Sequence, residues 1–251
     1  MVEWLTRSAW SDLYNLNGLT DAFITVDVDW APDFALEQLM LDLTKLGIPA
    51  TIFATHPTDL LIGAGPKFEI GIHPDFTRID KENTVKSKFE TLLRYYPAAL
   101  ATRSHRNFFG QNTCQIASGL GLRFELSHVT FQMPYAQVFA DQYGLTRASY
   151  TWEDGLHLDY GLPLEVQRVD LNSPGLKIFN LHPVLYYLNC TNDEQRKQAT
   201  SGISDLTSVK VSMLASHVNS GFGMRDFSLA LLSHLKSQNV KFHLVSQALN
   251  R

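Results

Sequence analysis

The chain has 251 residues, of which 45% are hydrophobic and 18% are charged. This is the composition of a globular protein with a sizeable core, and it excludes disordered, collagen-like and coiled-coil chains. With 21 Lys and Arg against 25 Asp and Glu, the net charge is -4, so no excess of cations is available to neutralise nucleic-acid phosphates or anionic lipid. We therefore expect no nucleic-acid partner.

The first twelve residues mix Glu3, Arg7 and Asp12 with apolar side chains, unlike the basic region and apolar run of a secretion signal. No stretch reaches the roughly 18 uncharged apolar residues of a membrane-spanning helix. Cys114 and Cys190 are isolated, so neither a disulfide framework nor a thiolate metal site is expected. The sequence thus predicts a cytoplasmic protein without membrane insertion, and it identifies no protein partner.

The predicted elements begin with a β-branched and aromatic strand over Phe23–Asp29. Pro32 and Asp33 then open a helix with apolar residues at helical spacing, and Gly47 ends it. Further strands are predicted over Ala50–Thr55, Phe68–His73, Ala99–Ser104, Leu122–Ser127, Thr146–Trp152, Leu176–His182 and Val240–Val245. Further helices are predicted from about Thr84 and over Asn112–Leu120, Ser204–Val218 and Phe227–Gln238.

This alternation of strands and helices is typical of an α/β protein with a parallel sheet. Seven or eight strands at this spacing favour a closed or nearly closed barrel over an open sheet. We therefore predict a closed or nearly closed parallel α/β barrel. The polar stretch Thr191–Ser204 is expected to be a surface loop that leads into a helix, so residues 1–251 are predicted to form a single domain.

In parallel α/β folds, catalytic groups lie at the carboxyl ends of the strands. Asp27 and Asp29 end the first predicted strand, where alternation would place both carboxylates on one face, about 7 Å apart. Two carboxylates at the end of an apolar strand are costly to bury unless a cation or an arginine compensates them. We interpret the pair as functional, although strand-end aspartates also serve as turn residues bonded to backbone amides.

Histidine is also concentrated at predicted strand ends. Three of the nine histidines precede proline, where composition alone would give fewer than one; they are His56, His73 and His182. Because proline cannot continue a central strand, these imidazoles are expected at the mouth of the barrel. His105 follows the next strand between Arg103 and Arg106, in an electropositive context suited to holding a carboxylate.

Trp30 and Trp152 stand beside acidic residues at predicted strand ends, where they either stack on a sugar ring or belong to the core. Glu153 and Asp154 are either partners of the site residues or turn residues. We include Trp30, Trp152 and Asp154 among the expected substrate-binding residues. The chain has no glycine-rich phosphate loop, no dinucleotide-binding fingerprint and no Gly-x-Ser-x-Gly elbow, so kinase, dehydrogenase and serine-hydrolase functions lack support.

Five motifs are together far more specific than any one of them: Asp-x-Asp, Ala-Thr-Ile-Phe-Ala-Thr, Glu-Ile-Gly-Ile-His-Pro, Arg-Ser-His-Arg and Phe-Asn-Leu-His-Pro. In this order they resemble the polysaccharide deacetylase (NodB-homology, carbohydrate esterase family 4) superfamily, and especially its WbmS-like branch, which is associated with O-antigen gene clusters. The matching segments run from Phe23 to Asn189, about two thirds of the chain. The resemblance implies a distorted (β/α) barrel of about seven parallel strands, a divalent metal and hydrolysis of an N-acyl group from a sugar.

The resemblance also implies roles for individual residues. It makes Asp27 the general base, with Arg103 to orient it, and His182 the acid that protonates the leaving group. Asp29 and His73 correspond to metal ligands. The expected metal is Zn²⁺, although Ni²⁺, Co²⁺ or Fe²⁺ would also suit mixed nitrogen and oxygen ligands.

Two positions depart from the family pattern. Val28 separates aspartates that are adjacent in the family, and Thr77 stands where the family has a second ligand histidine. A hydroxyl is a poor substitute for imidazole on zinc, so we predict His105 as the third ligand. Alternatively, Asp27 binds the metal directly, which leaves the base unassigned.

The sequence therefore predicts a metal-dependent carbohydrate N-deacetylase, a hydrolase of C–N bonds. Its expected partner is a small-molecule or oligosaccharide N-acyl sugar, most simply an N-acetylated amino sugar of a surface polysaccharide or its precursor. The alternatives are an N-deformylase or other amidohydrolase, a phosphoesterase, and a catalytically inactive sugar-binding barrel.

Overall fold

The computed structural model describes residues 21–249, so the N-terminal segment behind the localisation prediction lies outside the described residues, and the single-domain prediction extends beyond them. One mostly parallel sheet organises this range. Its strands are β1 (Ala22–Asp27), β2 (Ala50–Ala54), β3 (Phe68–Ile72), β4 (Ala101–Thr102), β5 (Phe124–Val129), β6 (Val138–Ala140), β7 (Thr146–Tyr150), β8 (Trp152–Glu153), β9 (Lys177–Leu181) and β10 (Phe242–His243). The order is β6-β7-β5-β4-β3-β2-β1-β9-β8, with β10 beside β1.

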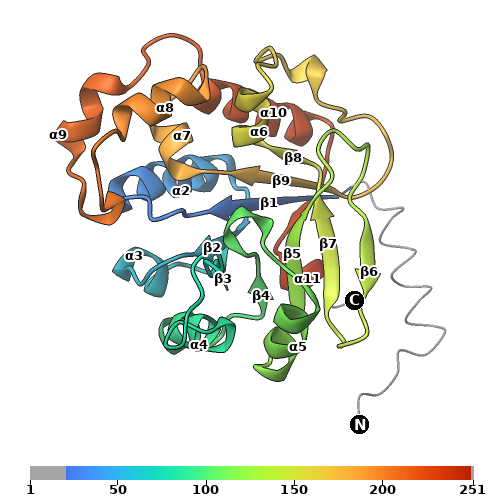
Figure 1. Cartoon of the computed structure of the whole chain (residues 1–251). Helices are drawn as coiled ribbons and strands as arrows, with labels where there is room; N and C mark the ends of the chain where they lie inside the picture. Colours follow the sequence, from blue (N-terminus) through green and yellow to red (C-terminus); the bar gives the residue numbers. More distant parts are fainter. Residues whose placement is uncertain (1–20, 250–251) are drawn as a thin grey trace.

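The sheet is curled into a half-barrel with helices around it (Figure 1). Its two ends are linked through one segment, because β7 pairs with β5 while β8, which follows directly, pairs with β9. Between them, the backbone N–H of Thr151 donates to the carbonyl oxygen of Ile178 in β9, at 2.9 Å. Every strand pair is parallel except β6 with β7. The predicted α/β barrel fold is therefore confirmed.

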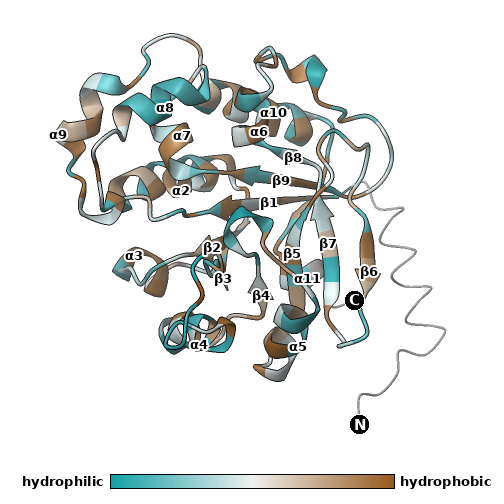
Figure 2. Ribbon diagram, in the orientation of Figure 1, coloured by the Kyte–Doolittle hydropathy of each residue, from teal (hydrophilic) through white to brown (hydrophobic). Residues whose placement is uncertain are grey.

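The helices cover the sheet with apolar stripes. They are α2 (Asp33–Leu46), α3 (Asp59–Ile62), α4 (Val85–Tyr95), α5 (Gln111–Gly119), α6 (Asp154–Asp159), α7 (Pro183–Leu188), α8 (Asp193–Ala199), α9 (Val211–Leu214), α10 (Met224–Ser237) and α11 (Val245–Leu249). In α2, Leu36, Leu39 and Leu43 are buried at helical spacing, and Gly47 ends the helix at φ 68°, a conformation that glycine adopts without steric cost. Figure 2 shows the hydrophobic residues of β1 near the centre and the hydrophilic α8 at the outside.

Several predicted elements are wrong in extent or type. The expected helix Ser204–Val218 is instead a series of short turns around α9, because Val209 and Leu214 alone are buried there and form no continuous stripe. Of the expected strand Ala99–Ser104, only Ala101–Thr102 forms a ladder; beyond it, the backbone N–H of Arg103 donates to Ile72 at the end of β3, and that of His105 donates to Pro74. The short helices α6, α7 and α8 and the antiparallel β6 were not predicted.

The carboxyl ends of β1, β3 and β9 open on the same edge of the sheet, because these strands are parallel. This edge carries the polar residues of the predicted motifs. Among the described residues, no helix combines the length and apolar character needed to cross a membrane.

Candidate metal and active site

Three side chains predicted as metal ligands meet at this edge. Oδ1 of Asp29 lies 3.1 Å from Nε2 of His73 and 3.0 Å from Nδ1 of His105. One ligand atom from each residue lies within 4.8 Å of the other two. Four ligands held tetrahedrally around zinc at about 2.0–2.2 Å are themselves about 3.3 Å apart. The spacing and chemistry of these donors therefore fit a small divalent cation.

Asp29 reaches this position by a turn and not by strand alternation. β1 ends at Asp27, and Asp29 and Trp30 then adopt left-handed conformations, with φ of 47° and 56°. The turn is closed by the backbone N–H of Ala31, which donates to Val28 at 2.8 Å. The expected extension of the strand to Asp29 is therefore wrong, although both aspartates line a common cavity of about 140 Å³. Positive φ is uncommon for residues other than glycine, and such strain often occurs at functional sites.

The two histidines come from adjacent strands. His73 directly follows β3, and its backbone N–H donates to Ala54 of β2 at 2.8 Å. The backbone N–H of His105 donates to Pro74 at 3.0 Å, which brings the turn after β4 against the end of β3. This arrangement explains how two histidines 32 positions apart face one carboxylate.

Electrostatics favour a charged carboxylate at the cluster. Burial alone would raise the pKa of Asp29, but hydrogen bonds from His105 and His73 and the positive charges of His73 and His182 hold this pKa well below its usual value. Burial lowers the pKa of His73, but the charges of Asp27 and Asp29 outweigh it and raise this pKa. The surroundings therefore keep the Asp29 carboxylate negatively charged, and a bound cation could compensate this charge.

Asp27 belongs to a buried network beside the cluster. Its Oδ1 accepts a hydrogen bond from the Arg103 guanidinium at 3.0 Å, and its Oδ2 accepts one from the Asn180 amide at 2.9 Å. Arg103 is completely buried, with its guanidinium over the rings of Phe53 and Tyr150 at 4.7 and 4.3 Å. The network fixes the Asp27 carboxylate in one orientation at the cavity wall.

His182 is held from behind by Asp154. Oδ1 of Asp154 lies 2.6 Å from Nδ1 of His182, and its Oδ2 accepts the backbone N–H of His182 at 2.7 Å. Burial lowers the pKa of His182, but Asp154, together with Asp29 and Glu153, raises this pKa well above its usual value. Nε2 of His182 faces the cluster, 3.8 Å from Oδ2 of Asp29.

The predicted substrate contacts need correction at two positions. Asp154 is completely buried behind His182 and lines neither of the cavities at the cluster, so it does not contact substrate there. Trp152 is 2% exposed, packs on Phe227 and donates its indole N–H to His157 at 3.2 Å, so the core leaves no ring face for a sugar. Trp30 does line the large cavity, and its expected contact with substrate stays a prediction.

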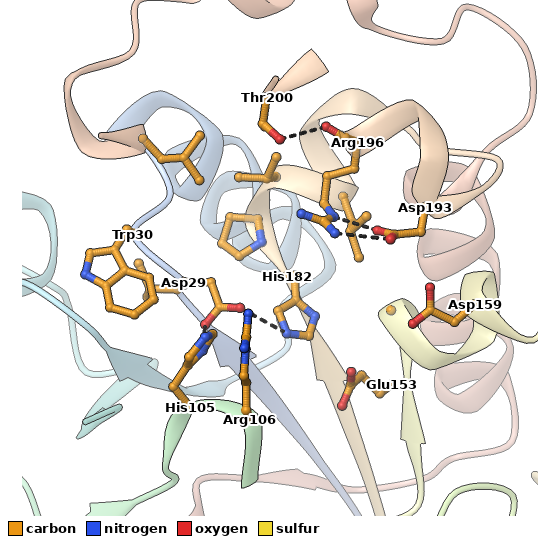
Figure 3. A pocket seen from close by; sticks show the side chains of 16 residues that line it. Asp29, Trp30, His105, Arg106, Glu153, Asp159, His182, Asp193, Arg196 and Thr200 are labelled. Carbon is orange, nitrogen blue, oxygen red and sulfur yellow. Dashed lines mark hydrogen bonds and ion pairs between the residues drawn. The ribbon is translucent and has the colours of Figure 1, made fainter. Parts of the chain in front are cut away.

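Two cavities meet at the cluster. The larger, of about 410 Å³, extends from Asp29 and Trp30 past His182 to α8 (Figure 3). The smaller, of about 140 Å³, reaches Asp27 and His73. The residues common to both walls are Asp29, His105, Arg106, Glu153 and His182.

Three residues of the site were not among the predicted site residues: Asn180, Glu153 and Arg106. Asn180 precedes His182 by two residues on β9, so strand alternation could have placed it on the same face. Glu153 was considered with Asp154, but no sequence signal shows which of the two reaches the cavity. Thr77 lies on an exposed loop and donates to Asp75 at 2.6 Å, away from the cluster.

Comparisons with known proteins agree with this fold. The family model "WbmS-like: Polysaccharide deacetylase" matches residues 24–200. Among solved structures, the chain is similar to WbmS of Bordetella bronchiseptica, a polysaccharide deacetylase candidate involved in O-antigen biosynthesis, with 24% identity, a TM-score of 0.75, and coverage of 85% of this chain and 90% of that one. It is also similar to a family 4 carbohydrate esterase from Bacillus anthracis, with 15% identity, a TM-score of 0.51, and coverage of 96% and 91%.

A third similar structure is a pseudoenzyme of the same esterase family, BA3943 from Bacillus anthracis, with 14% identity, a TM-score of 0.52, and coverage of 93% of this chain and 66% of that one. A search of the curated proteins gives no match.

Proposed function

Since the chain belongs to the WbmS-like polysaccharide deacetylase family, we propose that it is a metal-dependent hydrolase that removes an N-acetyl group from an amino sugar. The observation that carries the proposal is the convergence of Asp29, His73 and His105 beside the His182–Asp154 pair. The similar Bordetella protein is linked to O-antigen biosynthesis, which supports a surface polysaccharide or its precursor as the source of the sugar.

Asp29, His73 and His105 would hold the proposed cation with one carboxylate and two imidazoles, donors that suit Zn²⁺. When bound, it supplies a Lewis acid that polarises the amide carbonyl and lowers the pKa of a water molecule. Asp29, His73 and His105 contribute its protein ligands.

The remaining steps belong to the chain itself. Asp27 accepts the proton of the attacking water, and Arg103 and Asn180 keep its carboxylate aimed at the cavity. His182 donates a proton from Nε2 to the departing amine, because its Nδ1 is engaged by Asp154. An amine is a poor leaving group unless it is protonated, so this transfer is needed for the C–N bond to break.

Metal content tests the ligand assignment. We expect about one divalent ion per wild-type chain and a loss of most of it in Asp29→Ala, His73→Ala and His105→Ala, measured by elemental analysis of the folded proteins. His56→Ala is the matched control, because His56 also precedes proline at a strand end but its ring bonds Thr55 and lies outside the cluster. Full metal content in all three cluster variants would refute the site.

A substrate panel tests the reaction. Release of acetate from N-acetylated amino sugars, faster than formate from N-formyl sugars or phosphate from sugar phosphates, is the expected result. Preferred release of formate or phosphate would replace the proposal with a deformylase or a phosphoesterase. Metal-loaded protein that binds N-acetyl sugars without turnover would replace the proposal with a sugar-binding protein that lacks this activity.

A further inference from the structure

Two of the five residues at the junction of the cavities have no part in the proposed reaction. Asp29 and His105 serve as ligands and His182 as the acid, which leaves Arg106 and Glu153. Arg106 carries a positive charge at the point where the large cavity meets the cluster, and Figure 3 shows its side chain next to that of His105.

Arg106 is unusual among the cavity residues because nothing in the described part of the chain neutralises it. Its side chain forms no hydrogen bond and no ion pair with residues 21–249, and it is exposed. The other arginine of the large cavity, Arg196, is held by Asp193 through two bonds of 2.6 and 3.1 Å. Arg106 is therefore the arginine of this wall that can receive a ligand without losing a protein partner.

The backbone directs Arg106 into this position. Arg106 and Asn107 both have left-handed conformations, with φ of 56° and 55°, which residues other than glycine seldom adopt. The turn is anchored because the Asn107 amide donates to the Tyr150 hydroxyl at 2.7 Å and the Asn107 backbone N–H donates to Ser104 at 3.0 Å. The same turn carries His105, so the backbone of Arg106 is held beside the cluster.

The acidic residues of the large cavity do not neutralise the positive charge of Arg106. Asp29 compensates the proposed cation, and Asp193 is engaged by Arg196. Glu153 and Asp159 remain, and neither forms an ion pair with Arg106; such carboxylates can accept hydrogen bonds from sugar hydroxyls. Of the two arginines in this wall, Arg106 is therefore the one without a protein partner among the described residues, and it is free to bind an anionic group of the substrate.

We propose that Arg106 recognises an oxyanion on the substrate, so that the N-acylated amino sugar is an acidic one, bearing a carboxylate or a phosphate. The proposal rests on the proposed function for its site and deepens it by naming the substrate class. The planar guanidinium matches both oxyanions, because each accepts two parallel N–H bonds.

Binding to purified, metal-loaded protein tests this inference, with Kd measured by calorimetry. The probes are neutral N-acetylglucosamine, its C6-carboxylate analogue and its 1-phosphate. We expect wild type to bind at least one acidic probe about 10- to 100-fold more tightly than the neutral one. Preference for the carboxylate indicates a uronic acid sugar, and preference for the phosphate indicates a phosphate-linked precursor.

Three variants identify the residue responsible. Arg106→Gln is expected to lose the preference while keeping its affinity for the neutral probe, and Arg106→Lys to keep part of it. Arg94→Gln, which removes an exposed arginine of α4, is expected to behave like wild type. Equal affinity of wild type for all three probes, or an unchanged preference in Arg106→Gln, would overturn the inference.

Acetate release in the same samples judges the proposed function separately. An acidic preference that depends on Arg106 without any hydrolysis would sustain the inference and refute the deacetylase. Hydrolysis of the N-acetyl group without a preference for acidic probes would support the deacetylase and refute the inference about Arg106.

Discussion

Replacement of Asp154 by asparagine tests how the fold prepares His182 for proton transfer. Asparagine has nearly the same volume and keeps one carbonyl oxygen, so it can still accept the backbone N–H of His182. It loses the negative charge beside Nδ1, where the present contact is 2.6 Å, and it also loses the acceptor for the Gly155 backbone N–H, a loss that does not depend on the charge of His182. The substitution therefore removes the interaction that opposes the effect of burial on the imidazole.

The magnitude follows from the contact that is lost. A hydrogen bond to a charged group contributes about 1.5–3 kcal/mol, and 1.36 kcal/mol corresponds to about one pKa unit, so the pKa of His182 is expected to fall by about 1–2 units. Asp29 and Glu153 remain and keep the change from being larger. If His182 is the acid, kcat above the new pKa falls by about 10- to 100-fold while the metal content is unchanged.

The same pair makes stability depend on pH with a defined sign. The pKa of His182 is raised in the folded state, so its stabilisation is complete below the unfolded value of about 6.5 and disappears as pH rises through the folded pKa. The difference in unfolding free energy between wild type and Asp154→Asn is therefore expected to be large near pH 6 and to shrink as the pH increases.

Nitrogen-15 NMR titration of His182 measures the shift directly, and urea unfolding at several pH values measures the stability difference. Asp193→Asn is the control, because Asp193 also lines the large cavity but bonds Arg196 and not His182. An unchanged pKa of His182 in a folded Asp154→Asn protein would refute the reasoning.

Three further predictions concern stability. Arg103→Met removes the cation beside the buried Asp27, and it is expected to lower the free energy of unfolding, measured in urea, by about 3–5 kcal/mol. The control Arg94→Met, at an exposed position, should change this free energy by no more than about 0.5 kcal/mol, and equal effects of the two variants would contradict the proposed network. Burial raises the pKa of Asp42, but hydrogen bonds from Lys45, Gln38 and Tyr186 outweigh it and lower this pKa. Asp42→Asn is therefore expected to lower the free energy of unfolding by about 1 kcal/mol at pH 7, and this difference should vanish as the pH falls through the lowered pKa. Urea unfolding between pH 7 and pH 2 measures the trend, and a difference that does not depend on pH would exclude it. Gly71→Ala would bring a Cβ to 2.7 Å from the Phe53 ring and 2.9 Å from the Ala101 carbonyl, so we expect the free energy of unfolding to fall by about 1–3 kcal/mol, measured by heat or urea. Gly65→Ala is the control and should change it little, because a Cβ there meets no atom within 4 Å. An equally stable Gly71→Ala protein would show that the strands can separate at no cost.

The local sequence pattern predicted which edge of the sheet carries the site, because that edge is defined by the ends of the strands. Apolar runs that stop at His73 and His182 locate the edge of a parallel sheet, and parallel strands bring their carboxyl ends together. The Arg-Ser-His-Arg motif likewise placed His105 after a predicted strand, in a context suited to holding a carboxylate, and the structure brings His105 to Asp29. The α/β class and the family were predictable for the same reason.

Side-chain direction beyond a strand end could not be predicted from local pattern. Asp29 owes its position to two left-handed residues, and a single residue after a turn has no periodicity from which to read its face. In the same way, adjacent acidic residues have opposite fates: Glu153 reaches both cavities, whereas Asp154 is buried behind His182.

The sequence by itself determined the alternation of strands and helices, the polar strand ends and the family, since these depend on the order of residues along the chain. Tertiary structure alone decided that Trp152 packs on Phe227 in the core and that Asn180 reaches Arg103, because both contacts join segments far apart in the sequence. It also decided that Arg106 faces the cavity without a protein partner among the described residues. Burial and charge compensation are properties of the surroundings of a side chain, and distant segments supply those surroundings only when the sheet curls.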